Sequence, residues 1–464
     1  MTLRRCCWLG LASLAIFSLT LFLFPNPVRE ALAQGKEEAA QQALSLRDAV
    51  AVGLQKNPRI LAVKAQVEAS DARVGQARSG LFPQVEVSES YSRTNNPMWA
   101  FGTKLNQERI TSEDFDPQNL NHPKPIDNFS TVLSATLPLY DRGQTWHGVT
   151  QARLGHEAMT LLEARVGQEV NMEIVEAYMG AILARENLHV VEQTLQTSRS
   201  HYASISSRYK TGLVVKSDLL RAEVRLAELE QERLNAESQF HILEARLNAA
   251  MGEAPGNGYA LSTCLVCQEG LSESLEVYIQ KALENRKDLE NLRLQEQIAG
   301  EEVQKAKAAH LPGVYLSGNY EMDTEDFDDT ATNYTIGASL RLNVFSGFGY
   351  QSRVHEAAAN QRQAQAIIQQ MELGIQVETR QAYFQAKSAS DRIGVARASV
   401  IQAEEGLRIV RNRYENGMLT IVNLLDAEVA LQLARMHQIK ALHDFRVSMA
   451  RLHLAAGILD PASP

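Results

Sequence analysis

The residues of this chain that could do chemistry form incomplete motifs. A His-Glu pair begins the zinc-protease pattern at His156 and again at His355, but Thr160 and Ala359 stand where the second histidine ligand is needed. A glycine pair that starts at Gly75 has the spacing of a phosphate loop but lacks the lysine that completes it. We therefore expect a protein that is not an enzyme and that has no cofactor and no resident metal.

Two cysteines, Cys264 and Cys267, lie close together in a Thr-Cys-Leu-Val-Cys-Gln segment. A redox motif needs a helix N-terminus to lower the thiol pKa, and a zinc site needs two further ligands. Neither requirement is met in the sequence. A local disulfide is the interpretation that we favour for an oxidising compartment, and other roles of this pair stay open.

Acidic side chains crowd one segment of the second half, which reads Glu-Met-Asp-Thr-Glu-Asp-Phe-Asp-Asp from Glu321 to Asp329. The segment lacks the central glycine of a calcium loop. We interpret it as a solvated loop, with weak binding of divalent cations as the alternative. The net charge of the chain is −9, which gives no indication of a nucleic-acid partner.

The N-terminus has the pattern of a secretory signal peptide. Two arginines, Arg4 and Arg5, precede an apolar core at residues 8–24, and Ala31-Leu32-Ala33 matches the small-x-small cleavage pattern. We expect residues 1–33 to be removed, and a retained membrane anchor is the alternative. No later run of about eighteen apolar residues exists, so any membrane-spanning part of the mature chain must consist of β-strands.

The chain contains a tandem duplication, which defines its predicted domain organisation. Tyr-Lys-Thr-Gly at Tyr209 is matched by Tyr-Glu-Asn-Gly at Tyr414, 205 positions later, and the Leu-Leu and Ala-Glu-Val that follow also coincide. Similar stretches begin at Ala77 and Ala306, 229 positions apart, so the first half carries 24 extra residues between about 91 and 138. We predict a first repeat at 34–252, a linker at 253–273, a second repeat at 274–457 and a tail at 458–464.

Each repeat is predicted to contain long helices and one β-hairpin. Apolar residues at every third or fourth position predict helices, and alternation of apolar and polar residues predicts strands. In the first repeat we predict helices at 44–80, with a break at Asn57-Pro58, at 144–209 and at 215–251, and strands at 84–91 and 129–140 around a polar, proline-rich stretch. In the second repeat we predict helices at 274–309, 350–414 and 419–456, and strands at 313–322 and 333–345. The hairpins thus fall at about 84–142 and 313–347.

The predicted helix lengths exclude a compact globular fold. At 1.5 Å per residue the longest helices reach about 100 Å, whereas a compact domain is only about 30–40 Å across. Strands of about ten alternating residues are typical of a transmembrane β-barrel, but four strands are too few to close one. We predict an α+β membrane protein in which three copies share a twelve-stranded barrel that continues as a ring of helical rods. A soluble β-domain on a helical stalk is the alternative.

The sequence resembles the TolC family of outer-membrane efflux and secretion channels over about residues 44–457. The resemblance is carried by the opening LSLRDAVAVGLQKNPRI, the segment SGLFPQVEVS, the duplicated helix–hairpin–helix plan and the two Tyr-x-x-Gly turns. It implies a homotrimer in the lipid of the bacterial outer membrane, with an α-helical barrel in the periplasm and no catalysis.

The resemblance also implies partners. A periplasmic adaptor (membrane fusion) protein and an inner-membrane transporter of the RND, ABC or MFS class would complete a tripartite efflux pump or type I secretion system, through which substrates leave passively. The sequence does not select drugs, metal ions or proteins as the cargo. A periplasmic coiled-coil scaffold or adhesin without a channel is the alternative function.

By the same resemblance, the two duplicated turns are tips at the periplasmic mouth where the adaptor docks. The leucine pairs at 219–220 and 424–425 would pack each returning helix on its partner. Ordinary turns between helices are the alternative. The implied docking residues are Tyr209, Gly212, Leu213, Tyr414, Gly417 and Met418.

In the family, two acidic residues beside the second tip form a ring that narrows the pore. In the matching segment here, Asp426 keeps one acid and Asn423 replaces the other. Asp218 matches an acid that pairs, in some members, with a base of the other tip, but Leu419 stands where that base would be. The resemblance therefore implies a pore gate of Asp426, Asn423 and Asp218 that lacks this salt bridge. An Asp426 that merely faces solvent is the alternative.

Overall fold

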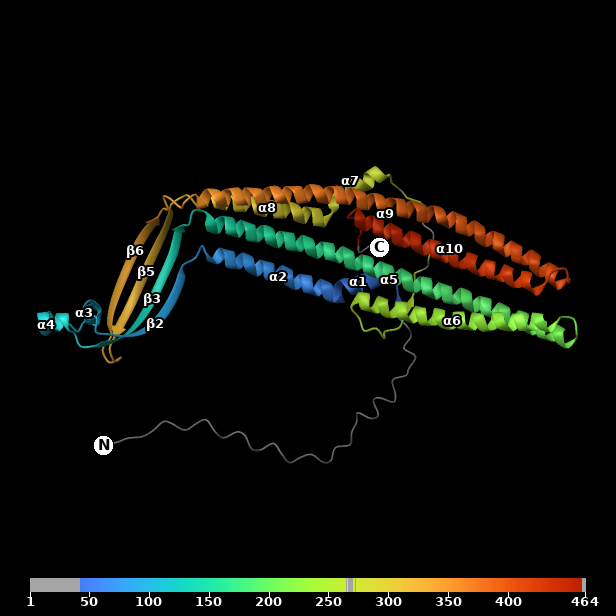
Figure 1. Cartoon of the computed structure of the whole chain (residues 1–464), viewed down its shortest axis with the longest axis horizontal. Coiled ribbons are helices and arrows are strands. Elements are labelled where there is room, and N and C mark those ends of the chain that lie inside the picture. Colours follow the sequence, from blue (N-terminus) through green and yellow to red (C-terminus); the bar gives the residue numbers. More distant parts are fainter. Residues whose placement is uncertain (1–41, 264, 266–269, 272, 461–464) are drawn as a thin grey trace, which may run out of the picture.

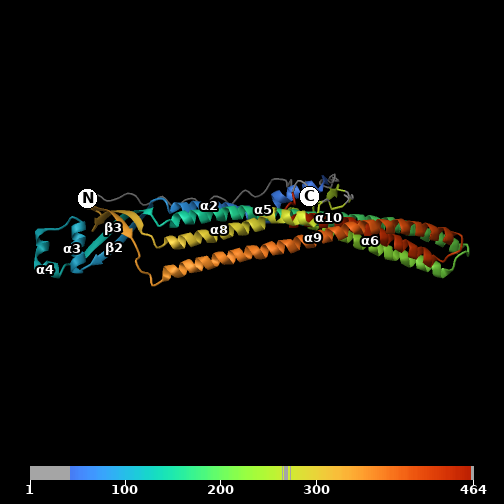
Figure 2. The same ribbon diagram turned by 90° about the horizontal axis from the view of Figure 1, so that it is seen from above.

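The chain is a long rod of helices with a small β-sheet at one end (Figures 1 and 2). The structure is a computed structural model that describes residues 42–263, 265, 270–271 and 273–460. The predicted signal peptide, the Cys264–Cys267 pair and the end of the tail lie outside the described residues. Within the described residues, no helix is both long enough and apolar enough to cross a membrane.

The element order repeats itself, as the duplication predicts. The first half contains β1 (Gln42–Leu44), α1 (Leu46–Lys56), α2 (Pro58–Ser79), β2 (Gln84–Thr94), α3 (Pro97–Asn106), a 3₁₀ turn η1 (Ser112–Phe115), α4 (Pro117–Asn121), β3 (Ile126–Tyr140), α5 (Gln144–Lys210) and α6 (Lys216–Met251). The second half contains β4 (Tyr259–Leu261), α7 (Leu275–Asn285), α8 (Lys287–Ala308), β5 (Gly313–Thr324), β6 (Ala331–Arg341), α9 (Gly349–Glu415) and α10 (Ile421–Ala455). Both α5 and α9 have 67 residues, and both α2 and α8 have 22.

One predicted helix, 274–309, is wrong as a single element. The chain leaves the helical conformation at Arg286, so α7 and α8 are separate helices. The cause is a tertiary contact, because the backbone at Gly457 packs so closely here that an added Cβ would lie 2.9 Å from the Arg286 nitrogen. The first half has the same arrangement, in which Gly252 packs against the break at Asn57 between α1 and α2.

The polar, proline-rich stretch between the first two strands, for which no element was predicted, contains two short helices and the 3₁₀ turn. Asn96 caps α3 by accepting hydrogen bonds from backbone N–H groups, and proline occupies the first helical position. Asp116 and the proline that follows it start α4 in the same way. A capping side chain followed by proline is a strong local start signal, which explains helices in a polar segment. At the other hairpin, β6 ends at Arg341 rather than near 345.

The helices pack as two layers of antiparallel neighbours along the rod. Nearest the sheet, α5 contacts α2 and α8, and α8 contacts α9. Toward the far end, α5 contacts α6 and α10, and α10 contacts α9. The shorter helices α2 and α6 therefore lie one after the other along α5, as Figure 1 shows.

The main apolar core lies at the middle of the rod. It gathers the centre of α5 with α1, the end of α6, β4 and the end of α10. Tyr178 is fully buried there, and its hydroxyl donates a hydrogen bond of 2.7 Å to the Leu44 carbonyl oxygen. This contact ties α5 to β1, which pairs in parallel with β4 and so joins the beginnings of the two halves.

The sheet at the end of the rod has the order β2-β3-β5-β6, and every neighbouring pair is antiparallel. The predicted alternation is confirmed by the register. Val85, Val87, Leu133, Tyr320 and Ile336 share one apolar face, as the pairings of Val87 with Leu133, Leu133 with Tyr320 and their neighbours require. Serine, threonine, asparagine and acidic residues occupy the other face. The strands β2 and β6 are the two edges and have no further partner among the residues that the structure describes.

Candidate functional site

The predicted docking residues lie at the two turns that form the end of the rod farthest from the sheet (Figure 1). Gly212 has a φ of 75° and Gly417 a φ of 72°, and a Cβ added to either would meet nothing within 4 Å. At each turn the N–H of the next residue, Leu213 or Met418, donates a 2.9 Å hydrogen bond back into the last helical turn. This is the glycine-dependent helix ending in which the left-handed backbone, rather than lack of space, requires glycine.

The two tips present their side chains differently. Leu213 and Met418 are exposed, at 76% and 66% of their surface, so each turn offers one apolar side chain to solvent. Tyr209 is also exposed, whereas its repeat partner Tyr414 packs into the cluster between the tips. Burial raises the pKa of the Tyr414 hydroxyl; the Arg208 guanidinium opposes this, and the nearby Asp218 carboxylate adds a smaller raising effect.

A small apolar cluster holds the two tips together. It consists of Ile205, Ala222, Leu407, Ile421 and Leu424, which come from all four helices of the tip region. The predicted packing of the leucine pairs is therefore correct for Leu219, Leu424 and Leu425, which belong to this cluster or its margin. It is wrong for Leu220, which is 48% exposed because it lies on the outer face of α6.

The predicted gate residues lie in the first turns after the tips but do not form one cluster within the chain. Asp218 is half-buried at the third position of α6, near Tyr414. Asn423 is exposed at the equivalent position of α10, where its side-chain oxygen accepts a 2.8 Å hydrogen bond from the Thr420 hydroxyl. Asp426 is exposed one turn further along the same face of α10.

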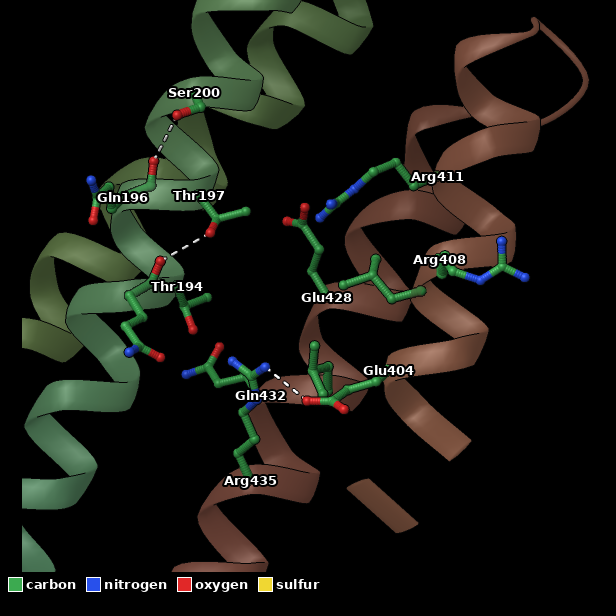
Figure 3. Close-up of a pocket in the computed structure, with 13 residues that line it drawn as sticks. Thr194, Gln196, Thr197, Ser200, Glu404, Arg408, Arg411, Glu428, Gln432 and Arg435 are labelled. Atoms are coloured by element: carbon green, nitrogen blue, oxygen red, sulfur yellow. Dashed lines mark hydrogen bonds and ion pairs between the residues drawn. The ribbon is translucent and has the colours of Figure 1, made fainter. Parts of the chain in front are cut away.

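A polar cavity behind the tips contains groups that the sequence analysis did not identify. It has a volume of about 630 Å³ and lies between α5 on one side and α9 and α10 on the other (Figure 3). Glu428 projects into it and is only 5% exposed. The Glu428 carboxylate lies 2.5 Å from Nδ1 of His201 on α5, so this polar contact connects the first helical pair to the second.

A second polar connection lies one turn further from the tips. The Arg225 guanidinium on α6 donates a 2.7 Å hydrogen bond to the side-chain oxygen of Gln432 on α10. The Gln432 amide in turn donates to Glu232 on α6, at 2.8 Å. Glu428 and Gln432 are four residues apart on one face of α10, and this spacing of polar residues on an otherwise packed face was the signal that could have identified them.

The fold and the site together define a class of protein. A sheet with one apolar and one polar face stands at one end of a rod about 100 Å long, and two glycine turns with exposed apolar side chains stand at the other. Such a chain is suited to forming part of a channel in a membrane, extended on one side by helices.

The comparisons with known proteins agree with this class. The profile of the outer membrane efflux protein family matches residues 49–253 and 278–458. The chain is 23% identical over 443 residues to the outer membrane protein TolC of Vibrio cholerae, covering 93% of this chain and 95% of that one. It is 24% identical to the alkaline protease secretion protein AprF of Pseudomonas aeruginosa, over 90% of this chain and 86% of that one.

Solved structures show the same fold. The outer membrane protein VceC from Vibrio cholerae superposes with a TM-score of 0.72 at 19% identity, over 89% of this chain and 96% of that chain. The outer membrane channel CmeC from Campylobacter jejuni gives a TM-score of 0.75 at 17% identity, over 90% and 87%. The chain belongs to the outer membrane efflux protein family, and is a channel protein of the bacterial outer membrane with a large periplasmic part.

Proposed function

We propose that three copies of this chain assemble into one channel that gives substrates a passive exit from a tripartite efflux pump or a type I secretion system. A periplasmic adaptor would bind the helical tips, and an inner-membrane transporter would supply the energy. The sheets of the three copies would form one closed barrel in the outer membrane, and the helices a periplasmic tunnel.

The observation that carries this proposal is the sheet, because its apolar face and the part of its polar face nearer the helices are uncovered in the single chain. The apolar face exposes large side chains, including Val87 at 67% and Tyr334 at 78% of their surface. Water is a poor solvent for such a continuous patch, whereas lipid is a good one. The opposite face is polar and is suited to line a water-filled path.

The edges of the sheet support assembly with other copies. β2 and β6 each present a row of backbone N–H and C=O groups without a partner in the sheet. Such groups are costly in lipid, and a closed barrel is the arrangement that pairs them. Four strands cannot close around a water-filled path, so β6 of one copy would pair with β2 of the next.

The helices support assembly in a second way. Two outer helices carry apolar stripes that no other element of the described chain covers. The α6 stripe consists of Leu220, Val224, Leu234 and Ile242, and the α9 stripe of Leu373, Val377, Phe384, Val395 and Ile409. Both stripes follow the heptad-like spacing of a coiled-coil contact, so α6 of one copy would pack against α9 of its neighbour.

The gate and the docking surface follow from this assembly. Threefold symmetry would bring three copies of Asp426 together, one turn from Asn423 and beside Asp218 of the adjoining tip, and acidic rings of this kind favour cations. The exposed Leu213 and Met418 next to Gly212 and Gly417 would offer apolar contacts to the helical hairpins of an adaptor.

The assembly is tested by fractionation and by mass. Extraction of the outer membrane with a mild detergent should release a folded trimer. A folded monomer or dimer, or a protein that is soluble without detergent, would contradict the proposal and favour the scaffold alternative.

The two site assignments have separate tests. Asp426→Asn should remove most of the cation preference in single-channel recordings, because it removes the ring of charge, and an unchanged preference would place the constriction elsewhere. Gly212→Val combined with Gly417→Val should weaken adaptor cross-linking while the trimer persists, since a β-branched residue is strained at positive φ. Unchanged cross-linking would remove the turns from the docking surface.

A further inference from the structure

The extra segment of the first half, which follows β2, is a folded unit and not a loose loop. A 2.6 Å ion pair between Lys104 and Asp114 joins α3 to η1, and the Asn119 amide on α4 donates a 2.9 Å hydrogen bond to the Glu113 carbonyl oxygen on η1. Phe101 and Phe115 add an edge-to-face ring contact with 5.8 Å between the centroids. Asp114 also accepts a 2.8 Å hydrogen bond from the backbone of Thr111. The second hairpin has no counterpart, since β5 and β6 are joined by the short acidic segment.

This unit, residues 97–121 and the connection to β3, is anchored to the polar face of the sheet. The Gln107 amide donates hydrogen bonds of 2.9 Å to the Asp127 carbonyl oxygen and 2.8 Å to the side-chain oxygen of Asn128, both on β3. The Asn333 amide on β6 donates a 3.2 Å hydrogen bond to the Asn106 carbonyl oxygen. The anchors therefore reach from β3 to the edge strand β6.

An ion pair completes the attachment. Arg109 pairs with Glu325, which follows directly after β5. The acidic segment thus gains a defined partner in the inserted unit, and the pair joins the two hairpins of the chain at the end of the sheet that is farthest from the helices (Figure 1).

The burial of the polar face shows where the inserted unit lies. On the central strand β5, polar side chains nearer the helices, Ser317 and Asn319, are exposed. At the far end, Ser130 and Asp323 are 7% and 1% exposed, although both belong to the same polar face. Asp323 accepts a 2.7 Å hydrogen bond from the Asn128 amide, the residue that Gln107 also contacts. The inserted unit therefore covers the outer end of the face that would line the channel.

We propose that residues 97–121 form an outer constriction at the exit of the channel, held closed by the Arg109–Glu325 ion pair and the Gln107 hydrogen bonds. This inference rests on the proposed function, because the polar face lines a path only in the assembled barrel. Three copies of the unit narrow the exit and decide which solutes pass, independently of the gate at the periplasmic tips. The unit also exposes Met98 and Trp99, so the constriction carries apolar surface that disfavours hydrated solutes.

The constriction is tested by thiol labelling from outside intact cells, which does not require the tips to open. The reporter is Ser88→Cys, on the polar face below the inserted unit, in a background with Cys264 and Cys267 changed to serine. In one variant, residues 95–125 are replaced by an Asn-Gly turn, which can close the hairpin because β2 and β3 are paired up to Thr94 and Ile126. Val87→Cys, on the apolar face, is the matched control.

A small charged methanethiosulfonate reagent should label Ser88→Cys in both proteins. A maleimide carried on a polyethylene glycol chain should label the shortened variant at least about tenfold faster than the parent, since passage depends on the width of the narrowest point. Arg109→Glu should also speed the bulky reagent, and adding Glu325→Arg should restore the slow rate. Val87→Cys should stay unlabelled by the charged reagent in both backgrounds.

Failure of the proposed constriction and failure of the proposed function give different labelling results. Equal rates of the bulky reagent in the parent and the shortened variant, with trimers present in both, would overturn the constriction and leave the channel proposal intact. Labelling of Val87→Cys in place of Ser88→Cys would mean that the polar face does not line the path, which contradicts the proposed function itself.

Discussion

Replacing Gly252 by alanine should destabilise the protein far more than the same change at Gly212. Both glycines have a φ of 75° and both end a helix of the first repeat. A left-handed backbone costs an alanine about 1–2 kcal/mol, and this cost applies at both positions. At Gly252 the added Cβ would also lie 2.6 Å from the Lys56 carbonyl oxygen and 2.8 Å from the Asn57 Cα, and these are backbone atoms that cannot rotate away.

The second cost is one of overpacking, which is about 1–3 kcal/mol in a well-packed site. Gly252→Ala should therefore lose about 2–5 kcal/mol, and Gly212→Ala about 1–2 kcal/mol, because nothing lies within 4 Å of its added Cβ. The assay is denaturant unfolding of the purified protein in mild detergent, followed by far-ultraviolet circular dichroism. Equal losses for the two variants would refute the claim that the backbone at the break between α1 and α2 packs too closely against Gly252 to admit a Cβ.

Two further predictions concern polar contacts. His201→Leu should destabilise the tips by about 3 kcal/mol, because it leaves the buried Glu428 carboxylate without its partner. The double variant that also carries Glu428→Leu should recover most of this loss. The rate of proteolysis at the tips measures both changes, and a double variant as unstable as the single variant would contradict the pairing. The Lys104 hydrogen bond, together with those from Thr111, lowers the pKa of Asp114 to about 2, so its contribution to the inserted unit is complete above the ordinary carboxyl pKa of 3.8 and is lost as the pH falls through about 2. Trp99 fluorescence in a Trp146→Phe variant should thus stay constant from pH 8 to 5 and change only below about pH 4, and a change centred above pH 5 would contradict this assignment.

Much of the architecture could be predicted because the strongest local signals repeat. The two Tyr-x-x-Gly motifs predicted where the chain reverses at both tips, since only glycine takes the left-handed backbone there without strain. The alternation of apolar and polar residues predicted which side chains share a face of the sheet, because successive residues of a strand point to opposite faces unless a bulge intervenes.

What escaped prediction depends on tertiary contacts or on weak local signals. The break at Arg286 has no proline and arises from the close approach of Gly457, which is far away in sequence. The helices of the inserted unit did have a signal, since Asn96-Pro97 and Asp116-Pro117 repeat the Asn57-Pro58 pattern that was recognised as a helix restart. The His201–Glu428 pair joins helices that meet only through folding, so spacing along one helix could suggest Glu428 but not its partner.

The central claim is that the four strands of one chain continue into those of another copy to close a channel. Cysteine cross-linking between the two free edges tests it most directly. Ser88→Cys on β2 is combined in turn with Thr335→Cys, Gly337→Cys and Ser339→Cys on β6, which lie on the same polar face, in a background without Cys264 and Cys267. Ser88→Cys with Val132→Cys, a neighbouring pair within one chain, controls for oxidation.

We predict that one of the three β6 positions gives covalent dimers and trimers, and no larger species, when outer membranes are oxidised. The control pair should form a disulfide inside the monomer alone. If the control pair oxidises while none of the three edge pairs links two chains, the edges are not joined between copies, and the shared-barrel account is contradicted.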